Sequence, residues 1–343
     1  MDELIHRIHC AFVEFDTDFV DIPQRNGFHY ENPTGLVEWM PLHQKGHRVV
    51  VKLVGYHPAN PIQRGLPTII STLSSYDTQT GHLTEIVDGT FLTAMRTAAA
   101  SCVASQLLSD PESQCLGLVG CGAQAVTQLH SILRRFPLTD VFYYDVDLFA
   151  VNSFSERVKP FVPDSVALRA STPDEISKRC QIICTATSVD VGEGPVIGLQ
   201  DCQPGLHVNA VGADFPGKTE LPAEFLKRSF VCPDFACQAM VEGECQQLDD
   251  EVTVSICDVA RAPERFLTEV AGTTVFDSTG FALEDWVVME LAVEKSRELG
   301  LGTLIPIESL SGDPQDPYGF LSRNLQRSGS MRPVVKTVIG SDS

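Results

Sequence analysis

The chain has 343 residues, of which 43% are hydrophobic and 20% charged, a globular composition with enough apolar material for two cores. Its 45 acidic and 25 basic side chains give a formal net charge of −20, which would repel nucleic-acid phosphates and anionic membrane surfaces. The apolar runs all fall short of the roughly 20 residues of a membrane-spanning helix. We therefore expect a soluble protein without nucleic-acid or membrane partners.

The first part of the chain predicts a sheet preceded by a helix. Residues 1–15 (MDELIHRIHCAFVEF) are typical of an amphipathic helix rather than a signal peptide, because they begin with acidic residues and lack a long apolar run. Short apolar runs bounded by turns predict strands of an antiparallel or mixed sheet at residues 35–41, 48–58, 66–77 and 82–88. Residues 90–108, rich in Ala and Leu, predict a helix that links two domains.

From residue 114 onward, short apolar strands alternate with helices, which predicts a parallel sheet covered on both faces. The strand-like runs lie at residues 115–120, 141–145, 166–170, 181–187, 207–212, 229–233 and 274–278. Residues 283–299 have helical periodicity and end at Gly300, and this helix could carry the chain back to the first domain. We expect an α/β protein with one domain at residues 1–109 and another at 110–301.

A dinucleotide fingerprint opens the second domain. Residues 116–125 (LGLVGCGAQA) read as a buried strand running into G-x-G-x-x-A and a helix. Gly120 permits the tight turn, Gly122 lets the backbone approach a pyrophosphate, and the helix start offers its amides to the phosphates. Asp145 ends the next strand, where a carboxylate bonds the ribose hydroxyls of NAD and repels the extra phosphate of NADP. The fingerprint predicts NAD; the alternative is a glycine-rich turn that binds nothing.

One carboxylate is a candidate general acid or base. Residues 207–214 (HVNAVGAD) form a strand followed by Asp214, which should project into the cofactor crevice. The alternative is that Asp214 caps a helix near Glu220.

The first domain places charged residues among apolar ones, at Glu38, Lys52 and Arg96. Buried charges are rarely solitary. Lys52 and Arg96, with Arg25, could clamp the carboxylate of an amino or keto acid, while Glu38 faces a substrate amine. Taken singly, each residue could instead be a surface charge or part of a structural ion pair.

The eleven cysteines form no CxxC pair, and several lie in strand-like runs, which favours reduced core thiols and a cytoplasmic location. A zinc cluster of Cys232, Cys237 and Cys245 is the alternative, but the spacing matches no common ligand pattern. We expect no metal site.

Six segments of the chain occur in a characteristic order: LPTIISTLSSYDTQTG, LTAMRTAAASCVAS, LGLVGCGAQAVTQ, HVNAVGADFPGKTEL, EGECQQL and FDSTGFALEDW. Together they resemble the ornithine cyclodeaminase and μ-crystallin family, and the resemblance extends from about residue 20 to residue 320. Within the family the chain is most similar to lysine cyclodeaminases, in VEWMP, the LPTI run, GAQAVTQ, FVCPD and DPY.

The resemblance implies roles for individual residues. Asp214 and Glu38 match catalytic positions, and Arg25, Glu38, Lys52 and Arg96 match substrate contacts. The implied cofactor contacts are Thr68, Arg96, Gly120, Gly122, Ala123, Gln124, Asp145, Thr187, Val211, Gly212, Lys218 and Ser278. The family fold implies a Rossmann NAD domain at residues 110–301. It also implies an α+β substrate-binding domain at 1–109, completed by about 302–343, that pairs two subunits into a homodimer.

The implied activity is that of an ammonia-lyase, a cyclodeaminase in which one NAD takes hydride from the substrate and returns it. L-Lysine would give L-pipecolate, or L-ornithine would give L-proline, with release of ammonia; the motifs favour lysine slightly. One alternative is an NAD(P)H-dependent reductase of cyclic ketimines such as piperideine- or pyrroline-2-carboxylate, against which Asp145 and Asp214 argue. A second is a crystallin-like protein that binds a nucleotide without turnover.

Overall fold

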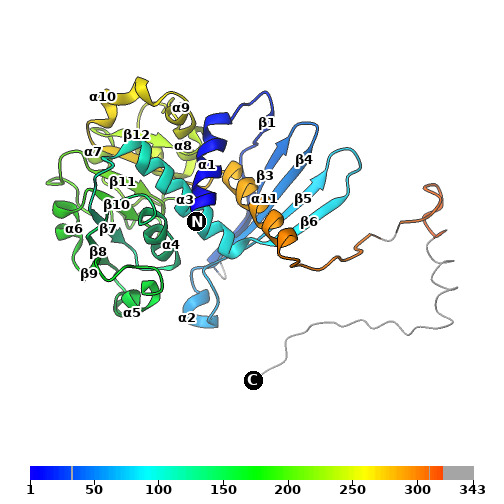
Figure 1. The fold of residues 1–343 in the computed structure, drawn as a ribbon, viewed down its shortest axis with the longest axis horizontal. Coiled ribbons are helices and arrows are strands. Elements are labelled where there is room, and N and C mark those ends of the chain that lie inside the picture. Colours follow the sequence, from blue (N-terminus) through cyan, green and yellow to red (C-terminus); the bar gives the residue numbers. More distant parts are fainter. Residues whose placement is uncertain (32–33, 309, 320–343) are drawn as a thin grey trace. The chain divides into compact units, whose positions relative to one another are not determined.

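The computed structural model describes residues 1–31, 34–308 and 310–319 (Figure 1). It divides into two compact units, residues 1–295 and the segment from residue 296 onward. Both β-sheets lie in the first unit. None of the helices in the described residues is long and apolar enough to cross a membrane. The expected completion of the first domain by residues 302–343 falls partly on residues 309 and 320–343, which lie outside the described ones, and stays a prediction.

The described residues between 20 and 88 include the strands of an antiparallel sheet, and most of these strands lie where short apolar runs bounded by turns predicted them. The strand order is β1-β3-β4-β5-β6, and β2 pairs with β3. Side chains alternate between two faces, so that Leu42, Val50 and Leu73 point into the core while Leu53 and Ile70 lie on the outer face. The strands are β1 (Val20–Asp21), β2 (Asn26–Glu31), β3 (Thr34–Gln44), β4 (Arg48–Tyr56), β5 (Ile69–Asp77) and β6 (Leu83–Asp88).

A parallel sheet with strand order β12-β13-β11-β10-β7-β8-β9 forms the other half of this unit. Its central strands are buried on both faces, which explains their near-continuous apolar sequences. The predicted α/β fold with a Rossmann-type sheet and a second sheet is confirmed. The strands are β7 (Cys115–Val119), β8 (Asp140–Tyr144), β9 (Ala167–Ala170), β10 (Ile182–Thr185), β11 (His207–Ala210), β12 (Phe230–Pro233) and β13 (Thr274–Asp277).

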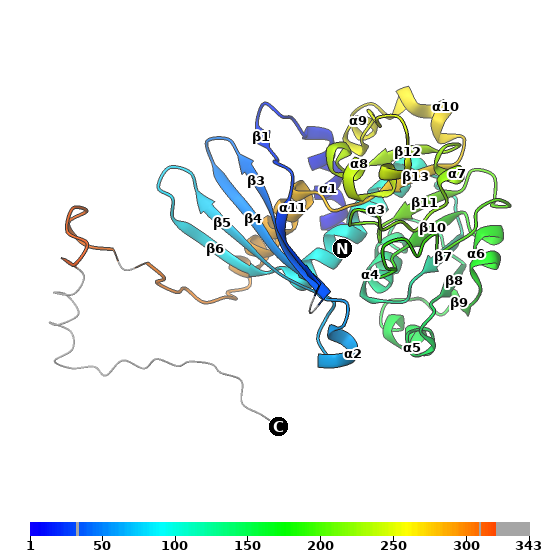
Figure 2. The ribbon, with the colours of Figure 1, turned by 180° about the vertical axis from the view of Figure 1, so that it is seen from behind.

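Helix α3 (Gly89–Leu108) runs between the two sheets, as both views show (Figures 1 and 2). The Asp88 side chain caps the start of the helix by accepting a hydrogen bond from the Thr90 amide at 2.9 Å. Near the other end, Ser105 Oγ accepts a hydrogen bond from Asn209 Nδ2 of β11 at 2.9 Å. Small side chains fill most of the helix and are buried, so both sheets approach it closely. The helix is the expected link between the halves.

The remaining helices cover the parallel sheet or flank the antiparallel one (Figure 1). They are α1 (Asp2–Glu14), α2 (Asn60–Arg64), α4 (Ala123–Ile132), α5 (Leu148–Val158), α6 (Pro173–Arg179), α7 (Ala223–Leu226), α8 (Ala236–Glu242), α9 (Ile256–Arg261), α10 (Leu267–Val270) and α11 (Ala282–Glu298), with 3₁₀ turns at Glu244–Gln247 and Pro263–Phe266.

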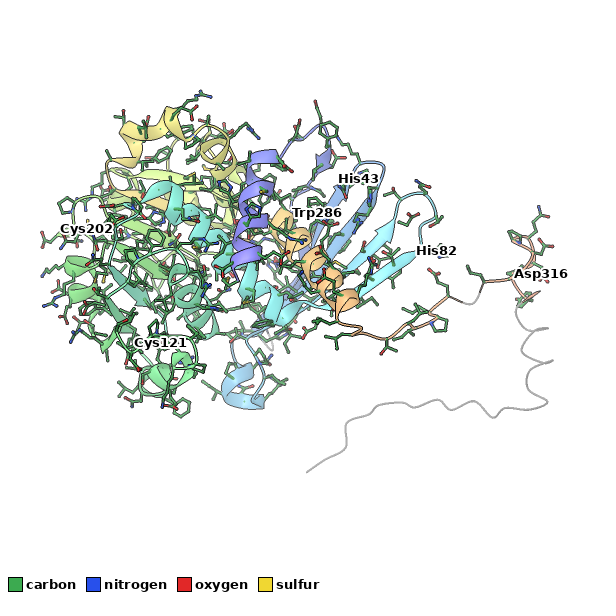
Figure 3. The ribbon with its side chains drawn as sticks, in the orientation of Figure 1. His43, His82, Cys121, Cys202, Trp286 and Asp316 are labelled. Carbon is green, nitrogen blue, oxygen red and sulfur yellow. The ribbon has the colours of Figure 1, made fainter. Side chains whose placement is uncertain are left out.

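Helix α11 returns the chain to the antiparallel sheet, as its position in the sequence suggested. Its Met289 packs with Val50 and Leu73 of that sheet, and Trp286, labelled in Figure 3, flanks this cluster. Arg48 Nη1 lies 3.1 Å from a carboxylate oxygen of Glu290. The sequence predicts that this helix belongs to the domain at residues 110–301, but the helix packs on the antiparallel sheet of the first domain. The domain limits themselves stay a prediction.

Candidate functional site

The residues expected to hold a dinucleotide lie at one edge of the parallel sheet. Gly120 follows β7, Asp145 follows β8, Thr187 follows β10, and Ser278 follows β13. After β7 the chain continues to β8 and β9 on one side of β7, and then crosses to β10 on the other side. A crevice at the carboxyl ends of the strands is expected where the strand order reverses in this way, and it is the usual ligand site of such sheets.

The glycine turn has the geometry that its sequence predicts. Gly120 adopts φ of 98°, and a Cβ at this position would lie 2.5 Å from the Ala186 carbonyl oxygen, so no side chain fits. A Cβ on Gly122 would meet nothing within 4 Å, which leaves open space beside the first turn of α4. An Asp145 carboxylate oxygen accepts a hydrogen bond from the Cys121 amide at 2.6 Å, and Cys121 is labelled in Figure 3. The carboxylate expected to bind ribose is thus anchored to the turn.

The buried carboxylate of Glu220 joins the loops that follow β10 and β11. One oxygen of Glu220 accepts from the amide and the hydroxyl of Thr187, at 2.7 and 2.6 Å. The other accepts from the Gly212 amide at 2.8 Å. A Cβ on Gly212 would lie 2.3 Å from Glu220, so glycine is needed for this approach. Glu220 is fully buried and was not expected at the site.

Unpaired polar atoms at this edge fit a bound dinucleotide. The Oε1 atom of Gln124, in the first turn of α4, and the Oγ atom of Ser278 are buried without a hydrogen-bond partner among the described residues. Buried polar atoms normally have partners, so these two atoms are available to a ligand. With the open space beside Gly122 and the α4 N-terminus, they match the donors and acceptors of a pyrophosphate and sugars.

A cavity of about 410 Å³ opens beside the loops that follow β10 and β11. It brings together Arg25, Glu38, Asp214 and Lys218, which were all expected at the site. Its other polar and aromatic lining residues are His29, Tyr30, Glu31, Thr34, Tyr56, Asp190 and Phe215. Lys52, Arg96 and Thr68 are not among the lining residues.

Asp214 lies at the cavity with its carboxylate 3.0 Å from the ammonium of Lys218. Burial by itself would lower the pKa of Lys218, but the charges of Asp214, Tyr56 and Glu220 and the hydrogen bond to Asp214 together raise this pKa above its ordinary value. The Lys218 ammonium also lies over the Tyr56 ring, 5.5 Å from its centre. The alternative role of Asp214 as a helix cap is wrong, because the next helix, α7, begins only at Ala223.

Arg25 lies between two carboxylates. Its Nε atom donates to Glu242, and its Nη1 atom is 3.7 Å from Glu38. It also donates to the Thr279 carbonyl oxygen at 2.7 Å. Burial raises the pKa of Glu242 to about 7, although Arg25 opposes this. Glu242 belongs to the EGECQQL segment, yet only the fold brings it to Arg25.

His29 was not among the expected site residues. Its Nε2 atom is 2.7 Å from a carboxylate oxygen of Glu38, and its ring packs on that of Phe215 with centres 5.0 Å apart. It lies on β2, a strand that was not expected. The signal in the sequence is the run NGFHYE at residues 26–31, where Asn-Gly precedes alternating aromatic and polar side chains.

Lys52 and Arg96 are buried in ion pairs at the start of α11. Lys52 Nζ is 2.7 Å from Asp285, and Arg96 is 2.8 Å from Glu284 and 3.0 Å from Asp285. Burial lowers the pKa of Lys52 to about 8. Both cations are therefore members of structural ion pairs, the alternative that the sequence left open for them. Their contact with a substrate carboxylate stays a prediction.

The other expected cofactor residues lie in two places. Ala123 begins α4, and Val211 is buried directly after β11, where its amide donates to the Thr185 carbonyl oxygen at 2.9 Å. Thr68 directly precedes β5 of the antiparallel sheet, and its carbonyl oxygen accepts from the His57 amide at 2.8 Å.

Comparisons with known proteins agree with this architecture. The sequence model that describes the ornithine cyclodeaminase/mu-crystallin family matches residues 1–299 of this chain. An L-lysine cyclodeaminase of Streptomyces rapamycinicus is 40% identical over 327 residues, which cover 93% of each chain. A lysine cyclodeaminase structure that concerns recognition of L-lysine, L-ornithine and L-2,4-diaminobutyric acid is 42% identical, with a TM-score of 0.89 over 93% of each chain. An archaeal alanine dehydrogenase dimer with bound NAD is 28% identical, with a TM-score of 0.79 over 90% of this chain and 95% of that one.

The hydrogen bonds of Glu220 generate a stability prediction. In Glu220→Gln an amide group replaces one acceptor oxygen, and either Thr187 or Gly212 loses its charged partner. We expect the free energy of unfolding to fall by about 2 kcal/mol in urea titrations. Glu224→Gln, at an exposed carboxylate of α7, should change it by less than about 0.5 kcal/mol. Equal unfolding midpoints for wild type and Glu220→Gln would contradict the conclusion that these hydrogen bonds of Glu220 stabilise the fold.

Proposed function

This chain belongs to the ornithine cyclodeaminase/mu-crystallin family, and we propose that it is an NAD-dependent cyclodeaminase of basic L-amino acids. The observation that carries the proposal is the cavity that places Asp214 and Glu38 beside the loops following β10 and β11. These loops also supply Thr187 and Gly212 to the cofactor edge, so a substrate in the cavity would lie next to the bound dinucleotide.

The proposed reaction converts L-lysine to L-pipecolate, or L-ornithine to L-proline, with release of ammonia. Bound NAD would accept a hydride from the α-carbon and return it after ring closure, so no net oxidation occurs. Between the two transfers, the side-chain amine attacks the α-carbon and ammonia leaves. Because the substrates differ by one methylene, worth only ~1–3 kcal/mol, the pocket discriminates weakly. Similarity to lysine cyclodeaminases favours lysine as the better substrate.

Each charged residue of the cavity has a task in this proposal. Asp214 exchanges protons with the attacking and leaving amines, since its carboxylate is one-third exposed and faces the cavity. Glu38 takes the proton of the α-amine. Arg25 orients the substrate carboxylate, which would compete with Glu38 and Glu242 for the guanidinium. For Lys52 and Arg96 to contact the substrate carboxylate, it would have to compete with the acids that already pair with them.

Two other functions stay as alternatives. A cyclic ketimine reductase would use only the second hydride transfer and an external supply of reduced cofactor, and it would not need the Asp214 carboxylate. A crystallin-like binding protein would hold the nucleotide without turnover, but it would not need the paired charges of the cavity. An assay of ammonia release separates both from the proposed activity.

The outer face of the antiparallel sheet supports a homodimer. The pairing register places Leu53 beside Trp39, and Ile86 beside Ser74, on the face opposite α11. Exposed apolar side chains gather on this face, and Ile86 is 59% exposed. We assign a second copy of the chain as its occupant, because the related alanine dehydrogenase with bound NAD is a dimer. The eleven free thiols support a cytoplasmic location.

The stoichiometry of cofactor use tests the proposed function. With substoichiometric NAD and excess L-lysine or L-ornithine, ammonia should accumulate over many turnovers without a lasting rise in NADH absorbance. Build-up of NADH equal to product would identify an ordinary amino-acid dehydrogenase instead. The ratio of kcat/KM for the two amino acids would then establish the preferred substrate.

Asp214→Asn should abolish ammonia release, because the amide cannot accept a proton, with a loss of about 10²-fold or more in kcat. NAD affinity, measured by calorimetry, should stay within a few-fold of wild type. The matched control is Asp174→Asn, which breaks an exposed aspartate–lysine pair of the same spacing with Lys178. Normal turnover by Asp214→Asn would remove this residue from the mechanism.

Charge on the outer sheet face should disrupt the dimer. We expect the double variant Leu53→Asp/Ile86→Asp to be monomeric in light scattering coupled to size-exclusion chromatography, because two charges per subunit would be buried without partners. Leu267→Asp, at an exposed leucine of α10 away from this face, should stay dimeric. A dimeric double variant would show that another surface pairs the subunits.

A further inference from the structure

His29 and Glu38 form a pair that spans the boundary between the buried site and solvent. The Glu38 side chain is 7% exposed, whereas that of His29 is 45% exposed. Their polar atoms are 2.7 Å apart, and both residues line the cavity. One end of the pair therefore faces the proposed substrate and the other reaches water.

The strand pairing explains why these two side chains meet. In the register of β2 and β3, Gly27 lies opposite Glu38 and His29 lies opposite Leu36, so His29 and Glu38 are diagonal neighbours. A Cβ on Gly27 would come within 2.6 Å of Glu38 Cγ, and glycine thus leaves room for the carboxylate to lean toward His29. The Phe215 ring packs on the imidazole from the loop that carries Asp214 and holds it over the cavity.

The proposed reaction needs proton movement at two places. Near neutral pH both amines of a basic amino acid are protonated, since an alkyl ammonium has a pKa of about 10. The α-amine must lose a proton before its carbon gives up hydride, and the side-chain amine must lose one before it attacks. Both protons return when ammonia and the ring amine are protonated, so the overall reaction changes no proton count.

The two carboxylates of the cavity have unequal access to water. Asp214 is one-third exposed and can exchange its proton directly. Glu38 is buried, and within the described residues its carboxylate pairs with His29 and Arg25. A guanidinium cannot accept a proton and stays charged, so Arg25 cannot carry the proton away. An imidazole can take a proton at one ring nitrogen and release one from the other.

We propose that His29 exchanges the proton of Glu38 with solvent during turnover, which makes it a positioning and proton-exchange residue of the site. The inference rests on the proposed cyclodeaminase function. In the outward step an N–H bond of the α-ammonium breaks and Glu38 becomes a carboxylic acid. Its proton then moves to His29 Nε2 while the other ring nitrogen gives a proton to water. The substrate holds a neutral amine, Glu38 is again a carboxylate and His29 is neutral, and the reverse sequence returns a proton.

Two variants of His29 test the proposal in the full-length holoenzyme. His29→Gln retains a hydrogen-bond donor for Glu38 but cannot carry a proton, so kcat for ammonia release should fall at least about tenfold. The KM for the amino acid and the Kd for NAD, the latter measured by calorimetry, should stay within a few-fold. His29→Ala should lose as much kcat and regain it with increasing concentrations of added imidazole, which fits the space left beside Glu38.

The matched control is His43, labelled in Figure 3, which lies on the same strand as Glu38 and pairs with the exposed Asp21 at 3.3 Å. His43→Ala should keep wild-type kcat and show no response to imidazole. If wild type releases ammonia but His29→Gln keeps its kcat, or His29→Ala does not respond to imidazole, the role of His29 is overturned while the proposed function stands. If wild type releases no ammonia from lysine or ornithine, both fall.

Discussion

Arg25, Lys52 and Arg96 are cations with little exposure to solvent, where an unpaired charge would cost several kcal/mol. Each is held by acids from a distant part of the chain: Arg25 by Glu242, and Lys52 and Arg96 by acids at the start of α11. Arg25 and Lys52 belong to the first 56 residues, whereas their partners follow β12 and β13. These ion pairs therefore hold the N-terminal segment and antiparallel sheet in register with the loops of the parallel sheet.

At the cofactor edge, the buried charged group is an acid, Glu220, and not a cation. The Glu220 carboxylate accepts its hydrogen bonds from two backbone amides and a hydroxyl. These donors come from the loops after β10 and β11, which also reach the cavity. The carboxylate thus determines how far apart the two loops lie, and with them the proposed cofactor and substrate sites.

The cavity between these two arrangements holds charges that are already paired. A substrate carboxylate would have to replace acids around Arg25, and an amine would have to compete with Lys218 for Asp214. Pairing limits the cost of burying these charges before a substrate arrives. The same burial isolates Glu38 from water and leaves the His29 imidazole as its connection to solvent.

The sequence by itself determined the α/β fold, the glycine turn at Gly120 and three charged candidates that line the cavity, Arg25, Glu38 and Asp214, whereas Lys218 was implied by the family resemblance. Short apolar runs, a steric need for glycine, and charges in or beside those runs are local features that can be read without knowing what packs against them. Only the tertiary structure decided which charges face the cavity and which are consumed in ion pairs. Lys52 and Glu38 look alike in sequence, as charged residues in apolar strands, but the acid that holds Lys52, Asp285, lies more than 200 residues away. His29 and Glu220 were missed for the same reason, since their roles come from partners on other strands and loops and not from their neighbours in the chain.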